Sequence, residues 1–233
     1  MNQQTSEYEY RVEAQPDFSF LTVKLQPEQT LKVEGSAMAT MDTNLRMKTK
    51  MRGGFKRFLT GESIFINEFT AQNGPGEIGI APGAPGDLDH VYLENDTIYL
   101  QNTAYVASSP AVNIETKWQG FMKGFFSGES LFLIKCSGQG DVWFNTFGGM
   151  IVIDVDGSYV VDTGHIVGFD PTITFDVRRV GGWKSTILSG EGLVCNLTGP
   201  GRILMQTRSE EAFLQWLIPK LPKQTSPSRS SDD

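Results

Sequence analysis

One pattern of about sixty residues occurs three times along the chain, and this repeat restricts the possible folds more than any other feature of the sequence. Each copy contains a Gly-Glu dipeptide and an apolar run, followed by a Gly-x-Gly turn and a further apolar segment. The dipeptides follow one another at nearly equal spacing, as Gly61-Glu62, Gly128-Glu129 and Gly190-Glu191, and the turns are Gly74-Pro75-Gly76, Gly138-Gln139-Gly140 and Gly199-Pro200-Gly201. A tandem repeat of this length indicates one supersecondary unit stacked on the next.

The segments upstream of the dipeptides align as well. Residues Thr30–Met38, Thr97–Tyr105 and Ser158–Ile166 have matching patterns and follow one another at nearly the same spacing as the dipeptides. Each copy therefore pairs short strands across turns rich in Gly, Asn or Asp, the residues that adopt a positive φ most readily. The folded part of the chain divides into three β units, residues 18–82, 83–147 and 148–208.

Alternating apolar residues predict β-strands in all three units. Leu21, Val23 and Leu25 alternate with polar neighbours, and this period of two is typical of a half-buried strand. Glycine and proline interrupt the pattern so often that we expect about six or seven short strands per unit. The predicted fold class is all-β, with three tandem small β-sandwich units and a short C-terminal helix.

The C-terminal end differs from the rest of the chain. Residues 209–219 have a helical pattern, with Ser209 as the N-cap, acidic residues at the favourable end of the helix dipole, and Pro219 ending the helix. Residues 220–233 are polar and are expected to be a disordered tail. The first fifteen residues or so form a polar arm before the first unit.

The size of the repeat favours association between units. A β unit of sixty residues is marginal alone, because it buries too small a share of its surface. Three units in tandem can complete one another's cores around a pseudo-threefold axis. Strands at the outside of such an arrangement have unpaired backbone edges that need covering, which favours assembly of several chains.

Composition excludes several classes of protein. The net charge of −7 and the isoelectric point of about 4.9 argue against general affinity for nucleic acid, which needs a basic surface. No apolar stretch is long enough for a membrane span, and the N-terminus does not resemble a secretory signal. The two cysteines, Cys136 and Cys195, lie in apolar strands and are expected to be free buried thiols rather than a disulfide. These features predict a cytoplasmic protein.

Several of these motifs resemble a known family. They are Gly74–Pro82, Pro85–Leu88, Thr103–Ser108 and Phe126–Phe132. Through them, residues 18–208 are similar to bacterial relatives of the mitochondrial biogenesis family named for altered inheritance of mitochondria. The resemblance implies a fold like that of the tryptophan RNA-binding attenuator protein, with three small β-sandwiches per chain and three chains closing a ring. It implies little chemistry, since bacterial members were catalogued as a domain of unknown function and mitochondrial members are linked to inner-membrane organisation.

The sequence does not assemble a convincing catalytic or metal-binding set. A metal-dependent oxygenase needs two or three histidines with a carboxylate, whereas this chain has His90 and His165 at different places in the repeat. Asp87 and Asp89 beside His90 are the best local cluster, although a solvated loop entering a strand is the favoured interpretation. Apolar surroundings would leave both thiols inert. We therefore expect no enzymatic activity, no cofactor and no metal.

The three repeated glutamates, Glu62, Glu129 and Glu191, occupy equivalent places. A structural residue is needed once per unit, whereas a catalytic residue rarely is. We interpret them, with the glycines that precede them, as structural residues that accept hydrogen bonds from backbone N–H groups. A ring of carboxylates that holds a cation is the alternative.

Basic and aromatic residues precede the first two dipeptides. The basic residues are Lys48, Lys50, Arg52, Lys56 and Arg57, and the aromatic residues are Trp118, Phe121, Phe125 and Phe126. Packing against a neighbouring unit or subunit is the favoured interpretation. Contact with a membrane surface or a protein partner is the second, and stacking with single-stranded nucleic acid the third.

The function that this sequence favours is a non-catalytic, ring-forming scaffold or interaction protein that assembles as a homotrimer. The alternative is a ligand- or RNA-binding regulator that uses the basic and aromatic hairpins.

Overall fold

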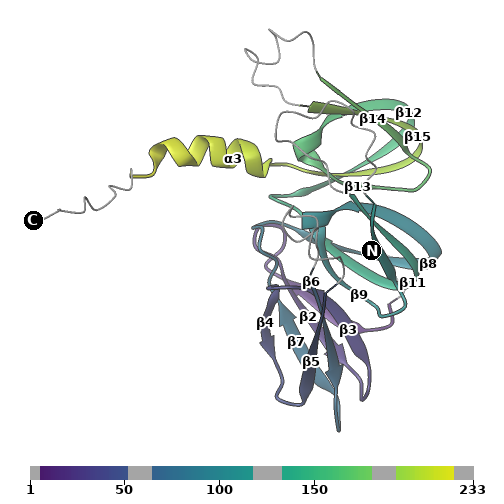
Figure 1. Ribbon diagram of the computed structural model, residues 1–233, viewed down its shortest axis with the longest axis vertical. Helices are drawn as coiled ribbons and strands as arrows, with labels where there is room; N and C mark the ends of the chain where they lie inside the picture. Colours follow the sequence, from purple (N-terminus) through teal and green to yellow (C-terminus); the bar gives the residue numbers. More distant parts are fainter. Residues whose placement is uncertain (1–5, 52–64, 118–132, 180–192, 223–233) are drawn as a thin grey trace, which may run out of the picture.

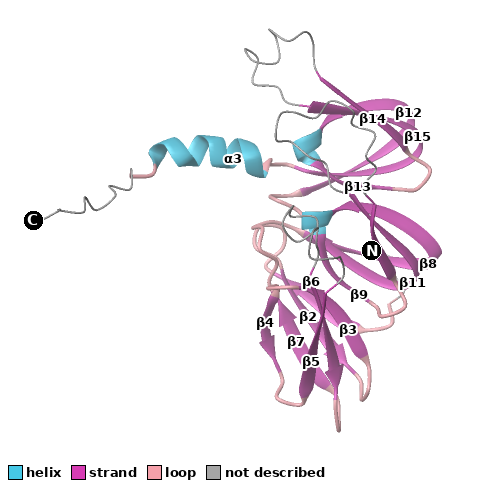
Figure 2. Cartoon of the chain, viewed as in Figure 1, coloured by secondary structure: helices cyan, strands magenta, loops and turns pink. Residues whose placement is uncertain are grey.

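The computed structural model describes residues 6–51, 65–117, 133–179 and 193–222. These residues form fifteen β-strands and one short α-helix, so the fold is all-β with a small C-terminal helix, as predicted (Figure 2). The first third contains β1 (Glu9–Glu13), β2 (Phe20–Leu25), β3 (Thr30–Glu34), β4 (Met38–Met41), β5 (Leu45–Met51), β6 (Phe65–Ala71) and β7 (Gly76–Ile80). The middle third contains β8 (Leu88–Gln101), a 3-10 turn η1 (Asn102–Ala104), β9 (Tyr105–Ser108), β10 (Asn113–Lys117) and β11 (Leu133–Asn145). The last third contains β12 (Met150–Asp162), η2 (Thr163–His165), β13 (Ile166–Phe169), β14 (Thr174–Arg179), β15 (Leu193–Gln206), α3 (Glu210–Leu217) and η3 (Ile218–Lys220).

The strands form two sheets. The smaller sheet has the order β1-β2-β7-β4. The larger sheet has eleven strands in the order β12-β15-β13-β8-β11-β9-β3-β6-β5, with β10 also on β11 and β14 also on β15. Figure 1 shows the three thirds of the chain following one another along the long axis, while α3 extends to one side. The larger sheet therefore runs through all three thirds.

Long antiparallel strand pairs form the centre of the middle and last thirds. β8 pairs with β11, and β12 pairs with β15, along nearly their whole lengths. Gly140, Gly157 and Gly201 have positive φ values of 129°, 123° and 152°, which let these strands turn without ending. In the first third the corresponding chain is broken into β2 and β3 and into β6 and β7, with a proline in each connection.

The described residues give the predicted number of strands in the first unit and fewer strands in the other two. Six strands, β2 to β7, lie in the first unit as it was bounded by sequence. Among the described residues the other two units have four strands each, fewer than predicted, because a glycine with a positive φ bends a strand there instead of ending it.

Two further expectations concern the ends of the chain. Ser209 caps α3 as predicted, since its Oγ accepts a hydrogen bond from Ala212 N at 3.4 Å. The N-terminal polar arm contains β1, which pairs antiparallel with β2 from Glu9 to Glu13. Residues 223–233 of the predicted tail lie outside the described residues. In the part of the chain that is described, no helix is long and apolar enough to cross a membrane.

Three hydrophobic clusters fill the interior, and each one includes residues from a neighbouring third of the chain. The first cluster takes Trp143 from β11, and the second takes Ile66 from β6. The third takes Leu133 from β11. Burying each such side chain stabilises the fold by about 1.5–3 kcal/mol. The thirds therefore depend on one another for a closed core.

A reciprocal pair of hydrogen bonds occurs at three places, once in each third of the chain. In each, the residue after a short strand donates its N–H to a carbonyl at 2.9–3.0 Å, and its side chain accepts the N–H of that same partner residue at 2.9 Å. The pairs are Asp42 with Glu77, Ser109 with Asp141, and Asp170 with Arg202. Each pair closes the turn that follows β4, β9 or β13.

Short strands also join the thirds by direct backbone pairing. β9 lies on β3, with Lys32 opposite Ser108 and Val33 opposite Ala107. β13 lies on β8, with Tyr99 opposite Phe169 and Leu100 opposite Gly168. The strands approach closely at Gly168, where an added Cβ would lie 2.4 Å from the carbonyl oxygen of Tyr99.

We expect Gly168→Ala to lower the free energy of unfolding by about 1–3 kcal/mol, because the new methyl group forces β13 away from β8. Urea denaturation measures this change. Gly83→Ala is the matched control, since nothing lies within 4 Å of a Cβ at that position. A Gly168→Ala protein as stable as the control would contradict the close approach.

Candidate functional site

Most of the residues singled out by sequence lie outside the described residues. Of the basic set, Lys48 is exposed on β5 and Lys50 lies on the same strand, whereas Arg52, Lys56 and Arg57 are not described. The aromatic residues Trp118, Phe121, Phe125 and Phe126 and the repeated Gly61, Glu62, Gly128, Glu129, Gly190 and Glu191 also lie in undescribed segments. Each of these segments connects two paired strands, namely β5 with β6, β10 with β11, and β14 with β15.

The acidic cluster around His90 does not converge on one point. Asp89 is exposed and His90 is buried, as successive residues of a strand must be when one face is covered. Asp87 Oδ1 accepts hydrogen bonds from Leu88 N at 2.8 Å and from the Gln15 side chain at 3.1 Å. Among the described residues, no group of three or more His, Cys, Asp and Glu side chains is placed to hold a metal.

His90 instead belongs to a buried polar cluster that the sequence analysis missed. Its Nε2 lies 2.6 Å from Asp141 Oδ1, and the Asp141 side chain is fully buried. Asp141 Oδ2 accepts the Glu7 N–H at 2.9 Å, and Ser109 Oγ donates to Glu7 Oε2 at 2.8 Å. The rings of Tyr10 and Trp143 each lie 5.1 Å from the imidazole.

This cluster fastens the N-terminal arm to the middle third. Ser109 Oγ donates to Glu7 Oε2 and lies 3.4 Å from Asp141 Oδ2, while the imidazole of His90 contacts Asp141 Oδ1. Burial raises the pKa of Tyr8, whose hydroxyl donates to Thr30 O at 2.6 Å. No local motif could reveal this cluster, because Glu7, His90 and Asp141 are far apart in the sequence.

The two thiols are buried, as predicted. Cys136 and Cys195 are both free and fully enclosed. Burial raises the pKa of each to about 12, so neither is a thiolate at neutral pH.

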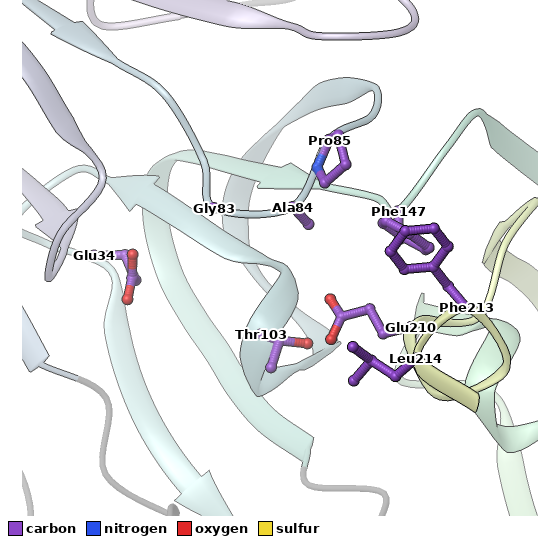
Figure 3. A pocket seen from close by; sticks show the side chains of 9 residues that line it. All are labelled: Glu34, Gly83, Ala84, Pro85, Thr103, Phe147, Glu210, Phe213 and Leu214. Carbon is purple, nitrogen blue, oxygen red and sulfur yellow. The ribbon is translucent and has the colours of Figure 1, made fainter. Parts of the chain in front are cut away.

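One hollow combines acidic and apolar walls (Figure 3). It has a volume of about 430 Å³ and lies between the end of β3, the connection from β7 to β8, η1 and α3. Glu34 and Glu210 face it from different sides, with Thr103 between them, and Phe213 and Leu214 form an apolar wall. The Phe213 ring lies 5.6 Å from the Phe147 ring.

The charges of this hollow suit a cation. Its lining includes two carboxyl groups and no basic side chain, so a positively charged group on an apolar stem fits its chemistry. Burial raises the pKa of Glu34 to about 7 from the ordinary 4.5. The sequence could not indicate this site, because five separate segments contribute to it.

The raised pKa gives stability a predictable dependence on pH. Between pH 4.5 and about 7 the folded chain keeps a proton on Glu34 that the unfolded chain releases, so stability falls as the pH rises through this window. We expect Glu34→Gln to remove this fall and, because Glu34 is only partly buried, to stabilise the fold by about 1–2 kcal/mol at pH 8. Urea denaturation at pH 4.5 and pH 8 measures this change, with Glu94→Gln as an exposed control. Equal slopes for wild type and Glu34→Gln would contradict the cause.

β4 and β12 each have one edge with no partner among the described residues. β4 is the last strand of the smaller sheet, and β12 is the last strand of the larger one. Large apolar side chains lie exposed along both, including Met41 on β4 and Tyr159 and Val160 on β12. Large apolar side chains are also exposed on α3 and η3, namely Phe213, Leu214, Trp216 and Ile218. Exposed edges with apolar side chains are typical of surfaces that bind another chain.

Comparison with known proteins supports the resemblance seen in the sequence. Residues 10–208 match the model of the family described as mitochondrial biogenesis AIM24. An uncharacterized protein of Streptococcus pyogenes serotype M6 is 24% identical over 226 residues, covering 91% of each chain.

A solved structure shows that the fold is shared. The crystal structure of a Streptococcus pyogenes protein from a structural genomics programme matches with a TM-score of 0.79 at 23% identity. The match covers 92% of this chain and the whole of that chain.

Proposed function

The chain belongs to the mitochondrial biogenesis AIM24 family. We propose that it is a non-catalytic scaffold protein and that three copies of it join into a closed ring. Each chain contributes three β units, residues 18–82, 83–147 and 148–208, in a fold like that of the tryptophan RNA-binding attenuator protein. The ring offers its surface to other molecules. A cytoplasmic location fits the two free cysteines.

The threefold pattern of hydrogen bonds supports three equivalent units. The reciprocal bonding occurs at Asp42, Ser109 and Asp170, and each of these residues lies equally far along the chain from the start of its aligned segment, at Thr30, Thr97 or Ser158. The hydrophobic clusters, each completed by a neighbouring third, also support units that need neighbours.

One observation carries the proposal of a ring. Each contact between thirds pairs a short strand, β9 or β13, with a strand of the preceding third, and one strand edge of each of these two kinds stays unpaired among the described residues. The edge of β3 is taken by β9 and the edge of β8 by β13. The corresponding edge of β12 and the outer edge of β4 are free among the described residues. A chain with two different, complementary ends associates head to tail, and such contacts form a ring when the rotation closes.

The polar side chains that are described favour binding over catalysis. His90 is held by Asp141 in the core, and both thiols keep their protons. A scaffold needs shape and edges rather than a reactive group, and the described residues offer those.

A ligand-binding regulator is the second candidate, and the hollow lined by Glu34 and Glu210 favours it. Its acidic lining suits an alkyl amine and repels the phosphates of RNA. A linear alkyl diamine should raise the melting temperature of the wild type and leave that of Glu210→Gln unchanged. Equal responses of the two proteins would remove this candidate.

The mass of the assembly tests the ring. We expect light scattering to give about three times the chain mass of 25.8 kDa at micromolar concentration, because head-to-tail contacts that close leave no free edge. A mass that stays at one chain would contradict the proposal, and a mass that rises steadily with concentration would indicate an open filament instead of a ring.

A further inference from the structure

We propose that residues Ser158–Asp162 of β12 pair antiparallel with β4 of a second copy, with Val160 opposite Met41 and Val161 opposite Thr40. This inference rests on the proposed function and specifies the contact that joins its copies. The pairing adds β4 of one chain to the larger sheet of the next.

The register follows from two contacts inside the chain, which are equivalent to each other. In the first, Lys32 of β3 lies opposite Ser108 of β9, and in the second, Tyr99 of β8 lies opposite Phe169 of β13. Lys32 and Tyr99 hold the same place in the aligned segments of their thirds. Ser108 and Phe169 are also equivalent, because each comes directly before a residue with reciprocal hydrogen bonding.

The same equivalence gives a third contact. Val160 holds the place of Lys32 and Tyr99 in the aligned segment that begins at Ser158. Met41 comes directly before Asp42 and so holds the place of Ser108 and Phe169.

The neighbouring residues follow the same rule. Inside the chain, the next residues pair as Val33 with Ala107 and as Leu100 with Gly168. The equivalent pair between two copies is Val161 with Thr40. β4 and β12 lie toward opposite ends of the long axis of the molecule (Figure 1), so the third contact needs two copies.

The two free strands have the shape of the strands that are already paired. Each of β4, β9 and β13 skips one residue in its pairing with the strand on its inner side, at Ala39, Val106 and Val167 respectively. Such a bulge bends a strand and fixes which side chains face outward. On the other side, Val160 and Val161 pair with β15 just as Tyr99 and Leu100 pair with β11.

Exposure of side chains marks the same positions. Ser108 and Phe169, which lie opposite a strand of the preceding third, are 0% and 1% exposed. Met41, at the corresponding place on β4, is 42% exposed, and Val160 on β12 is 59% exposed. β9 and β13 have a strand of the preceding third beside them, whereas β4 and β12 have none at this edge among the described residues, and a second copy would supply it.

The composition of both strands suits pairing. β4 reads Met-Ala-Thr-Met, and residues 158–162 read Ser-Tyr-Val-Val-Asp, with no proline and with one charged side chain, Asp162, at the end of the segment. Natural edge strands that must stay single are usually protected by lysine, proline or an inward-pointing charge. The β-branched and aromatic side chains of β12 also favour cross-strand contacts.

A disulfide trap tests the register. The double variant Val160→Cys/Met41→Cys places two thiols on opposite residues, whose Cα atoms lie about 4.5–5.5 Å apart in an antiparallel pair, within the range of a disulfide. On mild oxidation we expect covalently linked oligomers on a non-reducing gel, which a reductant converts to single chains. Both native thiols are buried, so the wild type should not crosslink.

Val160→Cys/Thr40→Cys is the matched control, because neighbouring residues of a strand point to opposite faces. Efficient crosslinking of the first variant and little of the second supports the register. Equal crosslinking of both overturns it. Failure of both variants to crosslink, in a protein whose mass is three chains, overturns this contact and leaves the scaffold standing, whereas a mass of one chain removes the scaffold itself.

A second variant does not depend on oxidation. Val160→Glu puts a charge on an exposed side chain of the single chain, so its circular dichroism should match that of the wild type. In the assembly it faces Met41, and we expect the mass to fall toward one chain. An assembly of unchanged mass would contradict the contact.

Discussion

The pairing of a short strand with the preceding third of the chain is the interaction on which the rest of the structure depends. β9 on β3 and β13 on β8 share only two residue pairs each, yet they connect the large sheet across all three thirds. A backbone N–H or C=O buried without a partner costs about 1–3 kcal/mol, so each third requires a neighbour at this edge. The contact also brings the clusters of neighbouring thirds together, so that residues such as Trp143 complete the core of the third beside them.

This dependence explains which residues are small or polar in the interior. Gly168 and Ala107 lie where two strands approach across the contact, and Gly168 has no room for a Cβ. Buried Lys32 lies at the same edge and donates to the carbonyl oxygens of Pro110 and Val112 at 2.6 and 2.8 Å. The side chain thus satisfies carbonyl groups next to the contact, which a purely apolar residue could not do.

The sequence predicted those features that repeat or that depend on neighbouring residues. Alternation at Leu21, Val23 and Leu25 and the Ser209 cap were read correctly, because period and capping are local. The last unit has fewer strands among its described residues than the sequence predicts, because Gly157 and Gly201 allow either a turn or a bend and only tertiary packing decides between them. The cluster of His90 with Asp141 and the hollow at Glu34 join distant segments, so one sequence could not predict them.

Amide hydrogen exchange at the two free edges tests the central claim most directly, which is that a second copy covers both edges. The amides of β4 and of residues 158–162 that point away from their present partners, β7 and β15, should exchange as slowly as those of β9 and β13 in the native assembly. Dilution below the association limit should release them while β9 and β13 stay protected. Fast exchange of these amides in the native assembly, at the rate of exposed loops, would contradict the claim.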